Sequence, residues 1–240
     1  MSRWFPLESN PEVINKYVLD LGLCSSYTFH DVLSTDAWAI DMLPSSPQCL
    51  LFLYPISPPQ EEWRESQAKS EDFATNLSNV DFFVEQNIGN ACGTIGILHA
   101  CGNLPKDALV EGKWLHKYFA GSNADDSTQT QTQSNAQRLE SDPEIQKVHT
   151  AACSSEANST ERGDLDQIVN THFVAFVRGK DDQVYEMDGR KEGPVCHGPI
   201  GGPIGGTGRS FGEVACGAVK GFMLRDPDEI KFTILAICKS

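Results

Sequence analysis

The sequence predicts one globular domain of the α/β or α+β class. Its 240 residues are enough for a sizeable core, in which roughly 70% of the unfolded chain's surface can be buried. The composition is ordinary for a globular protein, with 40% hydrophobic and 22% charged residues. Segments with helical periodicity also alternate with short apolar segments typical of strands, and no linker marks a boundary between them. We therefore expect residues 1–240 to form a single domain.

The chain is strongly acidic, with 33 Asp and Glu against 19 Lys and Arg and a net charge of −14. Nucleic-acid-binding proteins usually carry a basic face, and anionic membranes attract basic segments, so we expect neither partner. The charge fits a basic partner or serves solubility. There is no run of 18 apolar residues and no apolar segment of the kind found in signal peptides. We therefore expect a cytoplasmic protein. We also expect a monomer.

Eight cysteines are spread along the chain, and no two form a Cys-x-x-Cys pair. This spacing argues against a zinc site, and the chain is too long for a disulfide-stapled mini-protein. We expect reduced thiols, most of them small buried hydrophobic residues, and no cofactor.

The first half of the chain begins with a clear helix signal. Asn10 is a good N-cap, Pro11 suits the first helical position, and Gly22 ends the helical pattern. Residues 55–72 are Pro-rich and then charged, which indicates a surface connection. The other elements expected here are strands at 26–33 and 48–54 and helices at 35–43, 92–101 and 111–119, the 92–101 helix being apolar enough to be central.

The second half contains two segments without a core pattern. Residues 121–134 are of low complexity and indicate a flexible insertion, and residues 150–166 indicate a long exposed loop. Residues 193–212 are Gly-rich. The expected elements are a helix at 135–149, strands at 171–178, 183–187 and 231–238, and a helix at 211–223; the strand at 171–178 is apolar on both faces, as in the centre of a sheet.

Cys92 stands out among the cysteines because it lies in the first turn of an apolar helix, directly after a loop containing Gly89 and Asn90. Free N–H groups and the positive end of the helix dipole stabilise an anion at this position. A thiolate is such an anion, so the pKa of Cys92 is expected to be lowered. The alternative is a cysteine that only packs at a helix start.

A nucleophilic cysteine needs a base, and the base needs an orienting group. If Gly179 to Asp181 form a three-residue hairpin loop, His172 lies opposite Asp188, with Cβ atoms about 5 Å apart. An acid in that place can stabilise the imidazolium and select its tautomer. The alternative is a buried His and a solvated Asp-Gly turn.

The other histidines fit structural roles: His99 is expected in the core and His149 at a loop edge. Gln86, six residues before Cys92, could donate an amide N–H to an oxyanion beside the Cys92 backbone N–H.

Three blocks of the chain resemble the catalytic blocks of the ubiquitin carboxyl-terminal hydrolases, peptidase family C12. They are Gln86-Asn-Ile-Gly-Asn-Ala-Cys92-Gly-Thr94, His172-Phe-Val-Ala175 and Tyr185-Glu-Met-Asp188-Gly-Arg190. The segments 3–13 and 225–232 are similar to the short members of the family, the L3 isozyme in particular. The resemblance covers nearly the whole chain.

The resemblance implies a papain-like fold with a mostly antiparallel sheet between helices and a knotted backbone. It implies Cys92 as nucleophile, His172 as general base and acid, Asp188 as orienter and Gln86 as oxyanion-hole donor. The loop at 150–166 would cross over the active site and limit the leaving group to small adducts or short peptides.

The implied partner is ubiquitin, with NEDD8 as a second candidate. Expected contacts to ubiquitin are acidic loop residues and an N-terminal group: Glu156, Glu161, Asp164 and Asp166, with Trp4, Pro6 and Leu7. Two alternatives stay open at this point, namely another Cys-His-Asp acyl-transfer enzyme and an inert ubiquitin-binding module.

Overall fold

The computed structural model describes residues 3–70, 72–121, 129–155, 169–201 and 208–240. Its centre is a six-stranded antiparallel sheet with the strand order β1-β6-β2-β3-β4-β5. The strands are β1 (Tyr27–Asp31), β2 (Cys49–Pro55), β3 (Thr171–Arg178), β4 (Gln183–Met187), β5 (Val195–Pro199) and β6 (Thr233–Lys239). The prediction of an antiparallel sheet between helices is confirmed, while the knotted backbone stays a prediction.

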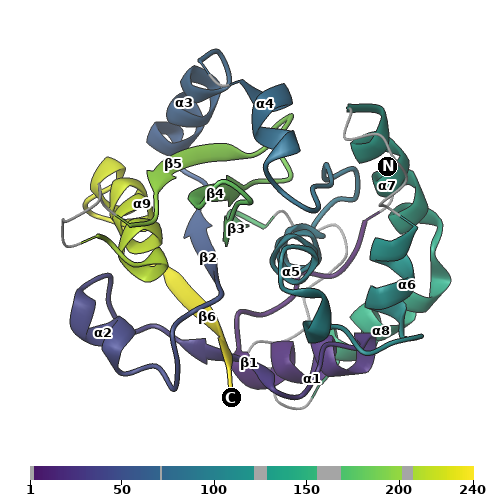
Figure 1. Cartoon of the computed structure of the whole chain (residues 1–240). Helices are drawn as coiled ribbons and strands as arrows, with labels where there is room; N and C mark the ends of the chain where they lie inside the picture. The colour runs from purple at the N-terminus through teal and green to yellow at the C-terminus, as the bar shows by residue number, and fades with distance from the viewer. Residues whose placement is uncertain (1–2, 71, 122–128, 156–168, 202–207) are drawn as a thin grey trace.

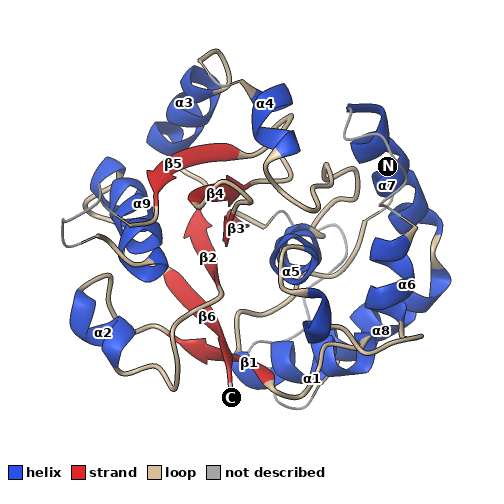
Figure 2. Ribbon diagram, viewed as in Figure 1, coloured by secondary structure: helices blue, strands red, loops and turns tan. Residues whose placement is uncertain are grey.

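Helices cover both faces of this sheet (Figures 1 and 2). In chain order they are α1 (Pro11–Leu21), α2 (Ala37–Asp41), α3 (Pro58–Gln67), α4 (Phe73–Ser78), α5 (Cys92–Gly102), α6 (Trp114–Ala120), α7 (Gln129–Ser141), α8 (Pro143–Cys153) and α9 (Phe211–Arg225), with a short 3-10 turn at Lys106–Ala108. No helix in the described ranges is both long and apolar enough to cross a membrane.

The core has two halves, one on each face of the sheet. Alternate residues of β3 enter different halves: Phe173 and Ala175 pack in the half that contains α5, whereas Val174 and Phe176 pack in the half that contains α9. This strand is therefore apolar on both faces, as predicted for a central strand.

Helix α5 lies directly against β2 and β3, and its residues from Cys92 to Cys101 are all buried. Its glycines make this close approach possible. A Cβ on Gly96 would lie 2.8 Å from Leu51 Cδ1, and one on Gly93 would lie 3.3 Å from Phe173 Cε2. The predicted central position of this helix is confirmed, and it brings Cys92 to the start of β3.

Several local expectations are also confirmed. Asn10 accepts a hydrogen bond from the Glu12 N–H, and Gly22 ends α1 with a φ of 104°. His99 is fully buried and hydrogen-bonds the backbone of Val84 and Met187. All eight cysteines are free thiols, and six of them are buried.

Residues 55–72 were expected as a surface connection, but α3 occupies most of this segment. The prolines that suggested a loop instead begin the helix, because Pro58 and Pro59 stand in its first turn and proline is tolerated there. No strand was predicted within the Gly-rich residues 193–212, yet β5 lies there. It is an edge strand. Proline is tolerated in such a strand, as at Pro199, because its missing N–H does not interrupt the hydrogen bonds in the interior of the sheet.

The predicted flexible insertion at 121–134 is wrong for its second half, because α7 begins at Gln129; residues 122–128 lie outside the described ranges. The single helix expected at 135–149 is two helices. Asp142 caps α8 by accepting the Glu144 N–H at 2.8 Å, and Pro143 begins it. The exposed loop expected at 150–166 begins later, because α8 continues to Cys153, and residues 156–168 are outside the described ranges.

Candidate active site

Cys92 is the first residue of α5 and is only 8% exposed. The loop before it is held from two sides. The Trp4 N–H donates to the Gly89 carbonyl at 2.9 Å, and the Gln86 N–H donates to the Gly189 carbonyl at 2.8 Å. Asn90 has a φ of 60°, which turns the chain sharply into the helix. The sulfur therefore lies at the N-terminal end of a buried helix, as predicted.

His172 lies near the start of β3 and is 2% exposed. Its Nε2 atom is 2.6 Å from Oδ1 of Asp188. Its side chain also interacts with the Cys92 thiol, and Nδ1 is the ring nitrogen that Asp188 leaves available. The ring is further confined by Tyr54, which pairs with His172 in the β2–β3 register and meets it edge-on at 5.8 Å. One imidazole therefore joins a thiol to a carboxylate.

The hairpin register that was predicted for this pair is wrong by two residues. Arg178 pairs with Val184, not Asp182, because the three-residue loop lies one position later than predicted: the Gly179 N–H donates to the Gln183 carbonyl, and residues 180–182 form the loop. The β3–β4 pairing ends at Ala175 and Met187, so His172 and Asp188 both lie beyond the last residues that pair between these two strands. Their side chains still meet, because both residues lie at the open end of the hairpin, opposite its turn.

The electrostatics of the three groups favour a charged thiolate–imidazolium pair. Burial alone would raise the pKa of Cys92, but the hydrogen bond and charge of His172, with backbone N–H groups of Phe173 and Gly93, lower it below the ordinary thiol value. Burial alone would lower the pKa of His172, but the charge and hydrogen bond of Asp188, with Cys92, raise it to about 9. The pKa of Asp188 is far below its usual range, since the charge of His172 outweighs burial.

Gln86 lies beside the turn that carries Asp188. A Cβ on Gly189 would lie 3.1 Å from the Cβ of Gln86, so this approach depends on a glycine. The amide nitrogen of Gln86 donates to the Ile88 carbonyl at 3.2 Å, and its Oε1 is buried without a partner. The amide group has a second N–H, for which an oxyanion would be a suitable acceptor.

Cys92 differs from most other cysteines of the chain in its surroundings. Burial raises the pKa of Cys101 to about 12 and of Cys216 to about 11. Cys24, which is half-buried, has a lowered pKa because of its hydrogen bond with Ser26. Cys153 also lies beside a histidine, at 3.3 Å from His149 Nε2. Cys92 is distinguished by a histidine that is itself held by a carboxylate.

The structure does not place the remaining predicted residues as expected, or does not describe them. Trp4 and Leu7 are buried, with Trp4 packed on the ring of His149, so their side chains are not presented as a contact surface. His149 was expected at a loop edge, but it lies within α8 and is buried. The acidic residues named at 156–166 lie outside the described ranges.

Sequence reasoning missed a buried ionic cluster next to Asp188, made by Glu186 and Lys191. The available signal was Glu186 itself, a charged residue within a strand whose other members are mostly buried. Across the described ranges, no group of three or more His, Cys, Asp or Glu side chains is arranged to hold a metal ion.

Comparison with known proteins adds independent evidence. Residues 4–223 match the family described as ubiquitin carboxyl-terminal hydrolase, family 1. The chain is 35% identical to ubiquitin carboxyl-terminal hydrolase 3 of Arabidopsis thaliana, over 99% of this chain and 94% of the relative. It is 30% identical to the rat ubiquitin carboxyl-terminal hydrolase isozyme L1, over 98% of each.

Among solved structures, the chain is similar to the UCH37 catalytic domain of Trichinella spiralis bound to ubiquitin vinyl methyl ester. The identity is 22%, the TM-score is 0.76, and the match covers 100% of this chain and 97% of that one. At this identity, the similarity establishes the fold.

Proposed function

The chain belongs to the ubiquitin carboxyl-terminal hydrolase family, as its three sequence blocks predicted, and from this premise we propose how it acts. It is a cysteine hydrolase of bonds to the C-terminus of ubiquitin. We propose that residues 1–240 form one catalytic domain, in which Cys92 is the nucleophile, His172 the base and acid, Asp188 the orienter and Gln86 the oxyanion donor.

The observation that carries these roles is the position of His172. Its ring interacts with the Cys92 thiol on one side and the Asp188 carboxylate on the other, the latter at 2.6 Å, and all three side chains are buried. A thiolate paired with an imidazolium can attack the carbonyl carbon that follows the last glycine of ubiquitin. The carbonyl oxygen then becomes an oxyanion, which the Cys92 backbone N–H and the Gln86 amide can stabilise.

The rest of the cycle uses the same groups. When the tetrahedral adduct collapses, the imidazolium of His172 gives its proton to the leaving amine or alcohol, and a thioester on Cys92 remains. Water then enters, His172 removes its proton, and the thioester is hydrolysed to free ubiquitin and the thiol. Asp188 stays ionised throughout and keeps the imidazole oriented.

Ubiquitin vinyl methyl ester provides the test of this assignment. The expected result is one covalent adduct per chain, mapped to Cys92, and none in the Cys92→Ala variant. An adduct on another cysteine would overturn the assignment of the nucleophile. No adduct, with Cys92 still alkylated by a small reagent, would favour the other acyl-transfer chemistry; no reaction with either reagent would favour an inert binding module.

The finer expectations about partners stay predictions. The same electrophile built on NEDD8 tests the second substrate. The limit to small leaving groups, the cytoplasmic location and the monomeric state each stay predictions as well.

A further inference from the structure

Lys191 follows Asp188 by three residues and is only 6% exposed. Its ammonium donates to Oε1 of Gln67 in α3 at 2.6 Å, and to a carboxylate oxygen of Glu186 in β4. Glu186 is equally buried, and its second oxygen lies 2.8 Å from Nε2 of His197 in β5. The Lys191–Glu186 ion pair, together with its hydrogen bonds to Gln67 and His197, therefore connects β4, β5 and α3 in the interior.

Stability alone does not explain such a pair. Removing two charges from water is costly, and well-packed apolar side chains of similar volume are often as stable as a buried ion pair. Buried ionic groups are best understood where they specify one arrangement of their neighbours. The neighbour here is the turn that carries Asp188.

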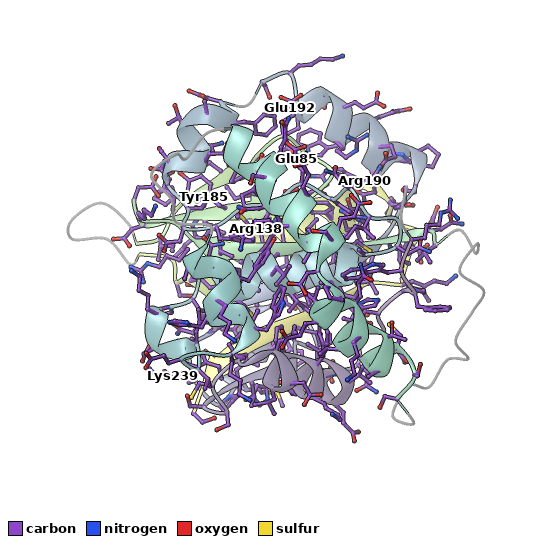
Figure 3. The ribbon with its side chains drawn as sticks, turned by 90° about the vertical axis from the view of Figure 1, so that its right-hand side faces the viewer. Glu85, Arg138, Tyr185, Arg190, Glu192 and Lys239 are labelled. Carbon is purple, nitrogen blue, oxygen red and sulfur yellow. The ribbon has the colours of Figure 1, made fainter. Side chains whose placement is uncertain are left out.

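That turn is anchored to α3 at two successive residues. The Arg190 guanidinium makes a two-pronged contact with Glu61, at 2.8 and 2.5 Å, and Lys191 reaches Gln67. Within the turn, the Arg190 N–H donates to Asp188 Oδ1 at 2.9 Å, and the Lys191 N–H donates to the Asp188 carbonyl at 3.0 Å. Figure 3 shows Arg190 and Glu192, the chain neighbours of Lys191, in the upper part of the molecule.

The position of the turn decides where the carboxylate points. Asp188 makes its 2.6 Å contact with His172 from just beyond the end of β4, where no strand pairing holds it. The charge of Lys191 also acts on Asp188, where it adds to the effect of His172 in lowering the pKa of that carboxyl. Lys191 is therefore placed to control both the position and the ionisation of the orienter.

Building on the proposed function of the triad, we propose that Lys191 is a positioning residue. Its ammonium, held between Glu186 and Gln67, keeps the turn docked on α3 and the Asp188 carboxylate aimed at His172. Without it, the turn keeps the Arg190–Glu61 contact but loses its second anchor to α3, and the contact between Asp188 and His172 lengthens.

Other charged and titratable groups surround this cluster. Tyr54 of β2 faces Asp188 and Glu186, Arg225 of α9 faces Glu186, and His197 binds Glu186 directly. Burial raises the pKa of Tyr54 well above its ordinary value, so it stays neutral over the range of the assay.

The test compares two variants with wild type. They are Lys191→Met and the double variant Glu186→Gln/Lys191→Met, and the double variant leaves neither charge of this ion pair unpaired in the interior. Lys180→Met is the matched control, because Lys180 pairs with Asp81 at the opposite end of the same hairpin and is half exposed. Two quantities are measured for each folded variant. One is kcat and KM on a ubiquitin C-terminal ester, and the other is the pH midpoint for alkylation of Cys92 by iodoacetamide.

For both Lys191 variants we expect kcat to fall about 10- to 100-fold, the size of effect that a misplacement of ~1 Å causes, with KM unchanged. We also expect the alkylation midpoint to rise by about one pH unit. A weaker Asp188 contact lowers the pKa of His172, and the thiolate then loses its imidazolium partner. The control variant should match wild type in both measurements.

A purely structural role predicts something different. Partial unfolding would reduce the amount of active protein but leave the midpoint where it is. If the folded double variant has the wild-type kcat and midpoint, the proposal is overturned, and this holds even if Lys191→Met alone does not fold. The alkylation measurement uses no ubiquitin, so it decides the role of Lys191 even if wild type proves inactive on the ester.

Discussion

Two cysteine–histidine pairs lie among the described residues, and one of them has the arrangement that the proposed nucleophilic chemistry needs. In the first, Cys92 lies beside His172; in the second, Cys153 lies 3.3 Å from Nε2 of His149. Both histidines are almost completely buried, and both cysteines are at helix termini. Proximity and burial therefore do not distinguish the two pairs.

The difference lies in what the second ring nitrogen meets. His172 Nε2 meets a carboxylate, so the ring can hold a positive charge and leave Nδ1 for the thiol. His149 Nε2 lies 2.8 Å from the Phe5 carbonyl, which can only accept, so this nitrogen carries a hydrogen and cannot take a proton from Cys153. Nδ1 of His149 is occupied by the Thr94 hydroxyl at 2.9 Å.

The helix ends also differ. Cys92 begins α5, where the helix dipole favours an anion, whereas Cys153 is the last residue of α8, where it disfavours one. The comparison teaches that a reactive thiol needs an oriented base and a favourable helix end together.

The largest expected effect separates the two thiols directly. Cys92→Ala should reduce hydrolysis of a ubiquitin C-terminal ester by at least ~10⁴-fold, because no other thiol in the described structure has an oriented base. Cys153→Ala should leave kcat unchanged. Steady-state kinetics with the two purified variants checks this, and equal losses in both would show that the comparison is wrong.

The next largest effect is expected when the carboxylate of Asp188 is removed. Asp188→Asn should reduce kcat by about 10³- to 10⁴-fold with unchanged affinity for ubiquitin, because the amide cannot stabilise the imidazolium. Asp182→Asn, an exposed residue at the other end of the same hairpin, is the control. Kinetics and ubiquitin titration give the two quantities, and near-normal turnover by Asp188→Asn would mean that another group orients His172.

The oxyanion donor gives a smaller effect. Gln86→Ala should reduce kcat about 10²- to 10³-fold, the cost of one such donor. Gln48→Ala is a close match, because its amide also donates to a backbone carbonyl two residues away, at 3.1 Å. Should the two variants have the same kcat, Gln86 would have no part in stabilising the oxyanion.

The smallest effect is expected for the pair formed by Cys153 and His149, to which we assign a structural role. His149→Gln should lower the free energy of unfolding by about 1–3 kcal/mol, because a buried partner of Thr94 or Phe5 is left unsatisfied. The pH dependence of turnover should not move, since His149 holds no reacting atom. Urea denaturation measures the first quantity, with His116→Gln as a control that should cost no more than ~0.5 kcal/mol.

Local patterns predicted the placement of Cys92 and His172 because their signals are local. Cys92 begins an apolar helix, and the β3 segment that carries His172 is apolar on both faces. The segments that were predicted wrongly lack such signals. The Thr-Gln run that continues into α7 and the Gly- and Pro-rich β5 have weak intrinsic propensity and are held by tertiary packing.

Long-range features could not be predicted from spacing. The β3–β4 register depends on how the turn closes, with Asp182 at a φ of 60°, and a single sequence does not specify this. Lys191 was missed because a lysine is ordinarily exposed, and its partner Gln67 is 124 residues away in the chain.

The most direct test of the central claim is the pH dependence of alkylation at each cysteine, followed by peptide mapping. Because the pKa of Cys92 is lowered, its reactive thiolate should persist below the ordinary thiol pKa of about 8.5 and be lost only as the pH falls through the lowered value. We predict that Cys92 is labelled at neutral pH with a low midpoint, that Cys153 is not, and that Asp188→Asn raises the midpoint. Labelling of Cys153 as fast as Cys92, or an ordinary midpoint for Cys92, would contradict the account.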